Sequence, residues 1–239
     1  MNVSVILPAA GLGTRMSAAT SGTSRKQFML LDGSPILVHT VRKFASCDLV
    51  SRIVVAVRPD DVEWVTELLN RESLAKPVQV VPGGDSRQQS VDNALAAIDP
   101  STDIVVVHDA VRPFVELQII ERVIREAAET GAAIVGVVPV DTVKRVTRAQ
   151  NGRARVAATI PRDRLVLAQT PQVFRYDLLR RAFDTARLDG FTGTDEASLV
   201  ERLEVDVMVI SGSDRNLKIT KPGDMELARL FLSQETGRA

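Results

Sequence analysis

The segment VILPAAGLGTRM, residues 5–16, is an apolar strand pattern that runs directly into a glycine-rich turn. Glycines let backbone N–H groups approach phosphate oxygens, because no Cβ stands in the way. Arg15 and Lys26 follow the glycines and could neutralise charge that amides alone cannot. This combination predicts a strand followed by a loop that holds a polyphosphate, and a nucleotide is the expected ligand. The alternative for the two cations is solvated surface charge.

Short β-branched runs alternate with amphipathic segments along the chain. The runs predict strands over residues 3–7, 52–57, 78–81, 103–108, 133–138 and 205–210. Helical spacing of apolar residues recurs between them, in Leu37, Val41 and Phe44, in Val91, Leu95 and Ile98, and in Ile119, Ile120, Val123, Ile124 and Ala127. Residues 104–107 are apolar on successive positions, which predicts burial on both faces. The expected fold is α/β, with a mostly parallel, Rossmann-like sheet and helices on both faces.

The chain is long enough for one main domain, which we expect to span residues 1–239. Residues 142–168 differ from the rest, because they combine an Asn151-Gly152 turn signal, several arginines and a β-prone run over residues 156–160. We expect this segment to form a β-arm that protrudes from the core.

Composition excludes several functional classes. Thirty basic and thirty acidic side chains give a net charge of zero, which disfavours a nucleic acid partner. One cysteine, Cys47, and two histidines can form neither an internal disulfide nor a Cys/His zinc site. No apolar run approaches the length of about 18 residues that a membrane span needs, and no targeting presequence is visible. We expect a cytoplasmic protein that acts on small anionic ligands.

Two familiar glycine-loop templates do not fit. A dinucleotide fingerprint would place a third glycine where Met16 stands, with an acidic residue about 20 positions later. A Walker A loop would need Gly-Lys followed by Ser or Thr. An NAD-dependent oxidoreductase is therefore disfavoured. The alternative for the glycine loop is a tight turn that binds no ligand.

Three segments that follow strand ends are expected to converge, because open α/β sheets bind ligands at the carboxyl ends of their strands. They are the glycine loop, Pro82-Gly83-Gly84-Asp85 and His108-Asp109. Glycine backbone groups and the Ser90 hydroxyl could line a pocket narrow enough for a pyrimidine base. The alternative for this second segment is simply a capped helix.

Asp109 and Arg112 follow the strand that is expected to be buried on both faces. Asp109 could attract magnesium or accept hydrogen bonds from hydroxyl groups, and Arg112 could bind a phosphate as a bidentate fork. The alternative is an Asp109–Arg112 ion pair that closes a turn. His108 is expected to pack at the strand end and not to perform acid–base chemistry.

Two further segments hold candidate residues. Residues 194–197, Thr-Asp-Glu-Ala, place an N-cap candidate and two acids at a helix start, as any well-capped helix would. Lys218 and Lys221 come just before the final helix, whose start is indicated by Pro-Gly-Asp. One of these lysines could reach the phosphate site, and either could be plain surface.

Together these segments resemble the 2-C-methyl-D-erythritol 4-phosphate cytidylyltransferase family of isoprenoid precursor synthesis. The resemblance covers nearly the whole chain. It rests on Pro-Ala-Ala-Gly-x-Gly-x-Arg-Met with Lys-Gln, Gly-Gly-Asp-Ser-Arg, His-Asp-Ala-Val-Arg-Pro, Gln-Thr-Pro-Gln, Thr-Asp-Glu-Ala-Ser and Asn-x-Lys-Ile-Thr, in that order. It implies a nucleotidyltransferase sheet, CTP and 2-C-methyl-D-erythritol 4-phosphate as substrates, and magnesium held mainly by the CTP phosphates.

The resemblance also implies individual roles. Cytosine and ribose would be held by Pro8, Ala9, Ala10, Gly11, Gly13, Gly83, Gly84, Asp85 and Ser90. The catalytic cations on the triphosphate would be Arg15, Lys26 and Lys218. The sugar phosphate would face Asp109, Arg112, Thr142, Thr170 and Thr194. Arg162 on the β-arm would enter a neighbouring subunit's active site, which implies a homodimer.

The chain departs from the family pattern in two places. The segment between Met16 and Lys26 is longer than expected, so Arg25 could share the task of Lys26. Around residues 139–142, which include Thr142, the chain is one residue shorter than usual.

Such a transfer needs no strong base, because a phosphate monoester has a second pKa near 6 and is largely dianionic at neutral pH. Two other functions stay open at this point. A pentitol phosphate cytidylyltransferase would share the glycine loop and the His-Asp-Ala-Val-Arg-Pro motif. A non-catalytic sensor would bind CTP without transferring its cytidylyl group.

Overall fold

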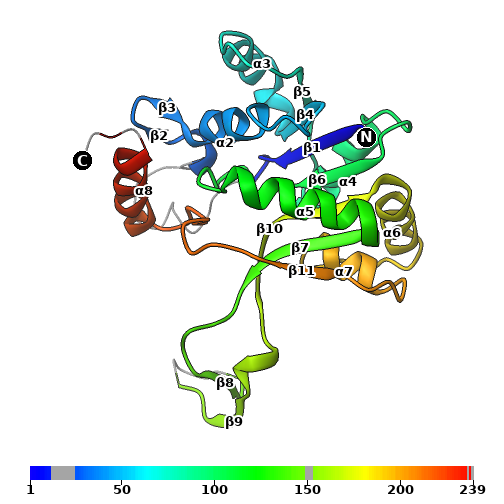
Figure 1. Cartoon of the computed structure of the whole chain (residues 1–239), viewed down its shortest axis with the longest axis vertical. Coiled ribbons are helices and arrows are strands. Elements are labelled where there is room, and N and C mark those ends of the chain that lie inside the picture. The colour runs from blue at the N-terminus through cyan, green and yellow to red at the C-terminus, as the bar shows by residue number, and fades with distance from the viewer. Residues whose placement is uncertain (12–24, 149–152, 236, 238–239) are drawn as a thin grey trace.

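The central sheet of this computed structural model, which describes residues 1–11, 25–148, 153–235 and 237, has helices on both faces (Figure 1). Its seven strands lie in the order β11-β7-β10-β6-β1-β4-β5. Their bounds are β1 Val3–Pro8, β4 Arg52–Val57, β5 Val78–Pro82, β6 Ile104–Val107, β7 Ala132–Val137, β10 Leu167–Arg175 and β11 Met208–Ser211. All neighbours pair in parallel except β10, which is antiparallel to both β6 and β7. The predicted mostly parallel sheet is confirmed.

The helices pack on the two faces in separate layers. Their bounds are α2 Ile36–Ala45, α3 Val62–Asn70, α4 Arg87–Ala96, α5 Leu117–Thr130, α6 Tyr176–Leu188, α7 Glu196–Glu201 and α8 Pro222–Glu235. Buried residues of α2, α3 and α5 form one hydrophobic cluster with one face of the sheet, and those of α4, α6 and α7 form a second with the other. Helix α8 packs beside the short hairpin of β2 (Leu30–Leu31) and β3 (Ser34–Pro35).

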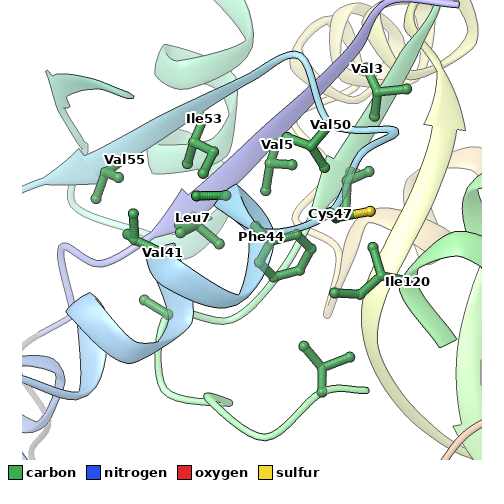
Figure 2. Close-up of a cluster of buried hydrophobic side chains, with 14 of the residues drawn as sticks. Val3, Val5, Leu7, Val41, Phe44, Cys47, Val50, Ile53, Val55 and Ile120 are labelled. Atoms are coloured by element: carbon green, nitrogen blue, oxygen red, sulfur yellow. The ribbon is translucent and has the colours of Figure 1, made fainter. Parts of the chain in front are cut away.

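Alternate residues of the central strands serve the two layers. In β1, Val3, Val5 and Leu7 belong to the first cluster, whereas Ile6 belongs to the second. Figure 2 shows the first cluster, which contains Phe44 of α2 and Ile120 of α5 together with side chains of β1. All four residues of β6 are buried, as their unbroken apolar run predicts. This packing holds the carboxyl ends of β1 and β6 side by side.

The strand predictions were wrong in two places. Strand β11 begins at Met208 and not at residue 205. Strand β10 was not predicted, because it contains Pro171, and proline normally argues against a central strand. A register shift between Gln169 and Gln172 accommodates this residue, so that β10 pairs on both sides of the shift.

The segment between β7 and β10 projects from the sheet (Figure 1). It carries an antiparallel pair, β8 (Val143–Val146) and β9 (Val156–Ile160), which form a two-stranded sheet of their own. The β-arm therefore has the hairpin form that the sequence predicts. Among the described residues, no helix combines the length and apolar character needed to cross a membrane.

Candidate active site

A cleft of about 320 Å³ lies at the carboxyl ends of β1, β5 and β6. It is lined by Pro8, Ala9, Ala10, Gly11, Lys26, Gln27, Gly84, Asp85, Ser86, Arg87, Ser90, Asp109, Ala110, Val111 and Lys218. The three segments that were expected to converge therefore do so, together with Lys26 and Lys218. Gly13 and Arg15, which the sequence assigns to the nucleotide, lie outside the described residues.

Gly83 lies directly behind the cleft wall and permits a close approach of two loops. A Cβ on this residue would stand 2.8 Å from the Ala10 Cβ, 2.9 Å from the Ser90 Oγ and 3.2 Å from the Val57 carbonyl oxygen. Real side chains do not pack this tightly, so a larger residue would push the β1 and β5 loops apart. Glycine is therefore required here for space.

The turn after β5 is held by hydrogen bonds at the start of α4. Ser86 is the N-cap, and its Oγ accepts a hydrogen bond from the Gln89 N–H at 3.0 Å. The buried Ser90 hydroxyl accepts from the Gly84 N–H at 3.1 Å and donates to the Ser86 carbonyl at 2.8 Å. The capped-helix interpretation is thus correct, and the same residues also line the cleft.

The glycine loop is tied to the chain that carries Lys26. Gln27 is 2% exposed, and its Nε2 donates to the carbonyl oxygens of Ala9 at 2.6 Å and Gly11 at 3.2 Å. Gln27 lies in the short 3₁₀ helix η1, Lys26–Phe28. Arg25 forms an ion pair with Asp61 and is not among the residues that line the cleft. The alternative in which Arg25 shares the task of Lys26 has no support from this geometry.

Three cations surround the Asp109 carboxylate at the cleft floor. The shortest distances to its oxygens are 2.7 Å from Lys218 Nζ, 3.3 Å from Arg87 Nε and 3.4 Å from Arg112 Nε. Burial alone would raise the pKa of Asp109, but the charges of Arg87, Lys218 and Arg112 outweigh it and hold the pKa well below its usual range. Glu196 also pairs with Arg87, so these three cations face two carboxylates, which leaves a surplus of one positive charge that suits an anionic ligand.

Arg112 and Lys221 differ from Lys218 in their positions. The predicted alternative for Arg112, an ion pair with Asp109, is present, and Arg112 Nη1 also donates to the Asn216 carbonyl at 2.6 Å. Arg112 lies outside the cleft lining. Of the two candidate lysines, Lys218 lines the cleft and Lys221 is exposed outside it.

Thr170 and His108 connect β10 to the cleft floor. The Thr170 Oγ1 accepts a hydrogen bond from the Asp109 N–H at 3.0 Å and lies 3.1 Å from His108 Nδ1. His108 is fully buried, and burial lowers its pKa to about 4. The ring is therefore neutral at pH 7. Its Nε2 donates to the Arg112 carbonyl at 3.0 Å in the tautomer that satisfies both contacts, so both ring nitrogens are engaged within the protein.

Arg87 and Glu196 were not assigned a role from the sequence. Arg87 Nη1 donates to both carboxylate oxygens of Glu196, at 2.7 and 2.9 Å. The Glu196 side chain is 1% exposed, and burial raises its pKa although Arg87 opposes this. For Arg87, burial lowers the pKa, but Glu196 and Asp109 outweigh it and raise the value. Arg87 therefore couples α4, the cleft floor and the start of α7.

The motifs contain both residues, yet no local pattern indicates their pairing. Arg87 and Glu196 are 109 positions apart in the sequence. A buried ion pair at that separation becomes visible only when the tertiary structure is known.

The remaining predicted residues lie away from the cleft lining. Thr142 is exposed near the base of the β-arm, and Arg162 is exposed on the short helix η3 (Arg162–Arg164), where it donates to the Val140 carbonyl. Thr194 is exposed, and the N-cap of α7 is Asp195, which accepts from the Ser198 N–H at 3.0 Å. Within one chain these three residues are not brought to the cleft.

Comparisons with known proteins agree with this site. The chain matches a family model described as IspD, 2-C-methyl-D-erythritol 4-phosphate cytidylyltransferase, over residues 3–234. A protein of that name from Solibacter usitatus is 64% identical, covering 100% of this chain and 99% of the relative. Another from Acidobacterium capsulatum is 55% identical, covering 100% of both chains.

Solved structures show the same fold. The 2-C-methyl-D-erythritol 4-phosphate cytidylyltransferase of Francisella tularensis superposes with a TM-score of 0.79 at 34% identity, covering 96% of this chain and 99% of the other. The 4-diphosphocytidyl-2C-methyl-D-erythritol synthase of Anaerococcus prevotii gives a TM-score of 0.83 at 27% identity, covering 97% and 96%. Four of the six motifs supply residues that line the cleft, the other two supply Thr170 and Glu196, which support lining residues, and the relatives match from end to end. This chain is a nucleotidyltransferase of the 2-C-methyl-D-erythritol 4-phosphate cytidylyltransferase family.

Proposed function

We propose that this protein transfers the cytidylyl group of CTP to 2-C-methyl-D-erythritol 4-phosphate, giving 4-diphosphocytidyl-2-C-methyl-D-erythritol and pyrophosphate. The observation that carries this proposal is the cleft, where glycine-loop backbone, Lys26, Lys218 and Asp109 meet. Pro8–Gly11, Gly83–Asp85 and Ser90 form the side that suits cytosine and ribose. Lys26 and Lys218, with Arg15, are assigned to the triphosphate.

The sugar phosphate is assigned to the part of the cleft that contains Asp109. Asp109 would accept hydrogen bonds from its hydroxyl groups, while Arg112 and Thr170 support Asp109 from behind. Thr142, Thr194 and Arg162 would complete this side in an assembly of two chains. These assignments follow the family pattern and fit the positive surplus around Asp109.

The transfer is a displacement at the α-phosphorus. A phosphate oxygen of the sugar phosphate forms a bond to that phosphorus as the bond to pyrophosphate breaks in line with it. Repulsion between two polyanions is the main barrier to their approach, and Lys26, Lys218 and Arg15 would offset it. Their charges also stabilise the charge that develops on the leaving oxygen. The cleft also lowers the barrier by orienting the two substrates toward each other.

We propose that magnesium is held mainly by the phosphates of CTP. The described residues contain no group of three or more His, Cys, Asp or Glu side chains able to hold a metal. Asp85 and Asp109 are the carboxylates that line the cleft, and Asp109 already has three cationic neighbours. Mg²⁺ commonly keeps water and phosphate oxygens as most of its ligands. When bound, it would help to neutralise the charge of the substrate phosphates.

Pyrophosphate release and product mass test the reaction directly. Release is expected with CTP and 2-C-methyl-D-erythritol 4-phosphate together, and the product should have the mass of the cytidine diphosphate adduct. With CTP alone, no release is expected. Faster turnover of ribitol 5-phosphate would replace the proposed substrate by a pentitol phosphate. Binding of CTP without any release would indicate a sensor and contradict the proposal.

Lys26→Ala is expected to lower turnover by at least about tenfold, or roughly 1.4 kcal/mol of barrier, because a charge that faces the triphosphate is removed. Lys221→Ala is the matched control, because Lys221 is an exposed lysine outside the cleft. Initial rates at saturating substrates would measure both. Turnover of Lys26→Ala that equals that of the control would contradict the role of Lys26.

We also propose that two chains form a homodimer through the β-arm. In the part of the chain that the structure describes, its two strands, β8 and β9, pair only with each other, and an isolated two-stranded hairpin is marginally stable in water. Exposed apolar side chains lie along it and at its base, namely Val138, Val140, Val146, Val156, Val166 and Leu167. A second copy of the arm would bury these side chains, and Arg162 would reach the partner's cleft.

Mixing two impaired variants tests whether Arg162 acts across the dimer. Lys26→Ala and Arg162→Ala are each expected to lose most of their activity alone. Coexpressed, they should recover about a quarter of wild-type activity, because half of the dimers would be mixed and each would contain one intact site. If Arg162 served its own chain, no mixed dimer would contain an intact site. Absence of recovery in mixed dimers isolated by two affinity tags would therefore contradict the proposal.

A further inference from the structure

Four side chains next to η1 form a cluster that does not line the cleft, which we call the Asp61 cluster: Arg25, Phe28, Asp61 and Trp64. Arg25 forms an ion pair with the Asp61 carboxylate. The Trp64 Nε1 donates to the same carboxylate oxygen at 3.1 Å. The Phe28 and Trp64 rings meet edge to face, with centroids 4.6 Å apart. The cluster thus joins η1 to the start of α3.

Asp61 has features that helix formation does not explain. It occupies the N-cap position of α3, yet its side chain makes no capping hydrogen bond. It is 1% exposed, and within the described part of the chain its Oδ2 is buried without a hydrogen-bond partner. A buried carboxylate that is poorly satisfied is costly to keep. Arg25 supplies the charge that offsets this cost, from a side chain that is itself 37% exposed.

The segment that this pair anchors carries Lys26. Helix η1 has three residues and no side-chain cap, so few local interactions hold it. On the cleft side, Gln27 binds the carbonyl oxygens of Ala9 and Gly11. On the opposite side, Arg25 and Phe28 contact the Asp61 cluster. Lys26 lies between these two sets of anchors and lines the cleft.

We infer that Asp61 is a positioning residue for Lys26: by holding Arg25, it orients η1 so that Lys26 faces the phosphates of the nucleotide. Asp61 itself does not contact the cleft. This inference rests on the proposed assignment of Lys26 to the triphosphate. Asp61 would affect the binding of CTP through Arg25 and Lys26, without contacting CTP itself.

Asp61→Asn tests the inference, because it removes the charge and keeps the size of the side chain. We expect kcat/KM for CTP to fall about fivefold, while KM for the sugar phosphate changes less than twofold. Asp60→Asn is the matched control, since Asp60 is the exposed preceding residue of the same 3₁₀ helix, η2 (Pro59–Asp61). An equal loss in both variants, or a loss shared equally by the two substrates, would overturn the inference.

A double-mutant cycle with Lys26 distinguishes positioning from a general structural role. If Asp61 acts through Lys26, Asp61→Asn should have no further effect on kcat/KM for CTP once Lys26→Ala is present. If Asp61 supports the fold by another route, the two losses should multiply, which would overturn the inference. Wild-type pyrophosphate release is measured in the same series. Failure of the wild type would refute the proposed function, whereas additive losses in an active enzyme refute only the inference.

Two further measurements keep the test decisive. If Asp61→Asn does not fold, the double variant Arg25→Met/Asp61→Leu removes the ion pair with less strain, because apolar replacements of buried pairs are often tolerated. The same fivefold loss of kcat/KM for CTP is expected.

Trp64 is the chain's single tryptophan, so its fluorescence emission reports on the Asp61 cluster. CTP should change that emission in the wild type and Asp60→Asn, with a midpoint about fivefold higher in Asp61→Asn. An unchanged midpoint would overturn the inference.

Discussion

Replacing Arg87 with methionine is expected to lower the free energy of unfolding by about 3–5 kcal/mol, the usual effect of removing one partner of a buried ion pair. Within the described residues, Arg87 is the one cation paired with Glu196, whose side chain is 1% exposed. Asp109 keeps Lys218 and Arg112 in the variant, so the carboxylate left without a partner is that of Glu196. Urea denaturation at pH 7 would measure the change.

Arg71→Met is the matched control for this prediction. Arg71 also pairs with a glutamate, Glu67, at 3.3 Å, but the two side chains are 77% and 61% exposed. Exposed pairs contribute about 0–1 kcal/mol, so this variant should unfold almost as the wild type does. If the two methionine variants lost similar stability, burial of the Arg87–Glu196 pair could not be the source of its strength.

In the His108→Gln variant, the free energy of unfolding is expected to fall less steeply than in the wild type as the pH is lowered. The pKa of His108 is lowered to about 4 in the folded protein, whereas an unfolded histidine titrates near 6.5. Above about pH 6.5 the His108 side chain is neutral in both the folded and the unfolded state, and its contribution to the free energy of unfolding is fully present. As the pH falls from about 6.5 to 4, the unfolded state takes up a proton that the folded state excludes, and about 3 kcal/mol is lost. Glutamine does not titrate and should lack this component.

Urea denaturation of both proteins at intervals from pH 7 to pH 4 would test this prediction. The variant is expected to be less stable at pH 7, because glutamine cannot reproduce the contacts of the ring with Thr170 and Arg112. The difference between the two proteins should narrow below about pH 6.5. Carboxylates titrate in both proteins and cancel in that difference. Parallel stability curves would show that the His108 pKa is not depressed in the folded state.

Local patterns were sufficient to predict most of the sheet and one wall of the site. Unbroken apolar runs indicate strands that are buried on both faces, because successive side chains of a strand point to opposite faces of the sheet. In β6 all four side chains are apolar and buried. Glycines after β1 and β5 indicate loops that approach closely, and Gly83 indeed has no room for a Cβ. The order of the motifs was enough to indicate the family, which the comparisons confirm.

Strand β10 shows where local patterns fail. Pro171 lacks an N–H group and argues against a central strand, yet β10 pairs with β6 and β7 around a register irregularity. The pairing is stabilised by neighbours that are distant in sequence, so no window of the chain contains the information. The consequence for the site is direct, because β10 brings Thr170 to the Asp109 N–H.

From the sequence alone came the periodicity of strands and helices, the glycine loops and the cations beside them, because these depend on residues that are close along the chain. The partners of those cations depended on tertiary structure. Only the fold pairs Arg25 with Asp61, Arg87 with Glu196, and Lys218 with Asp109. An ion pair requires its two groups within a few ångströms and out of water. Packing of the two helical layers determines which charges meet, and the order of residues does not.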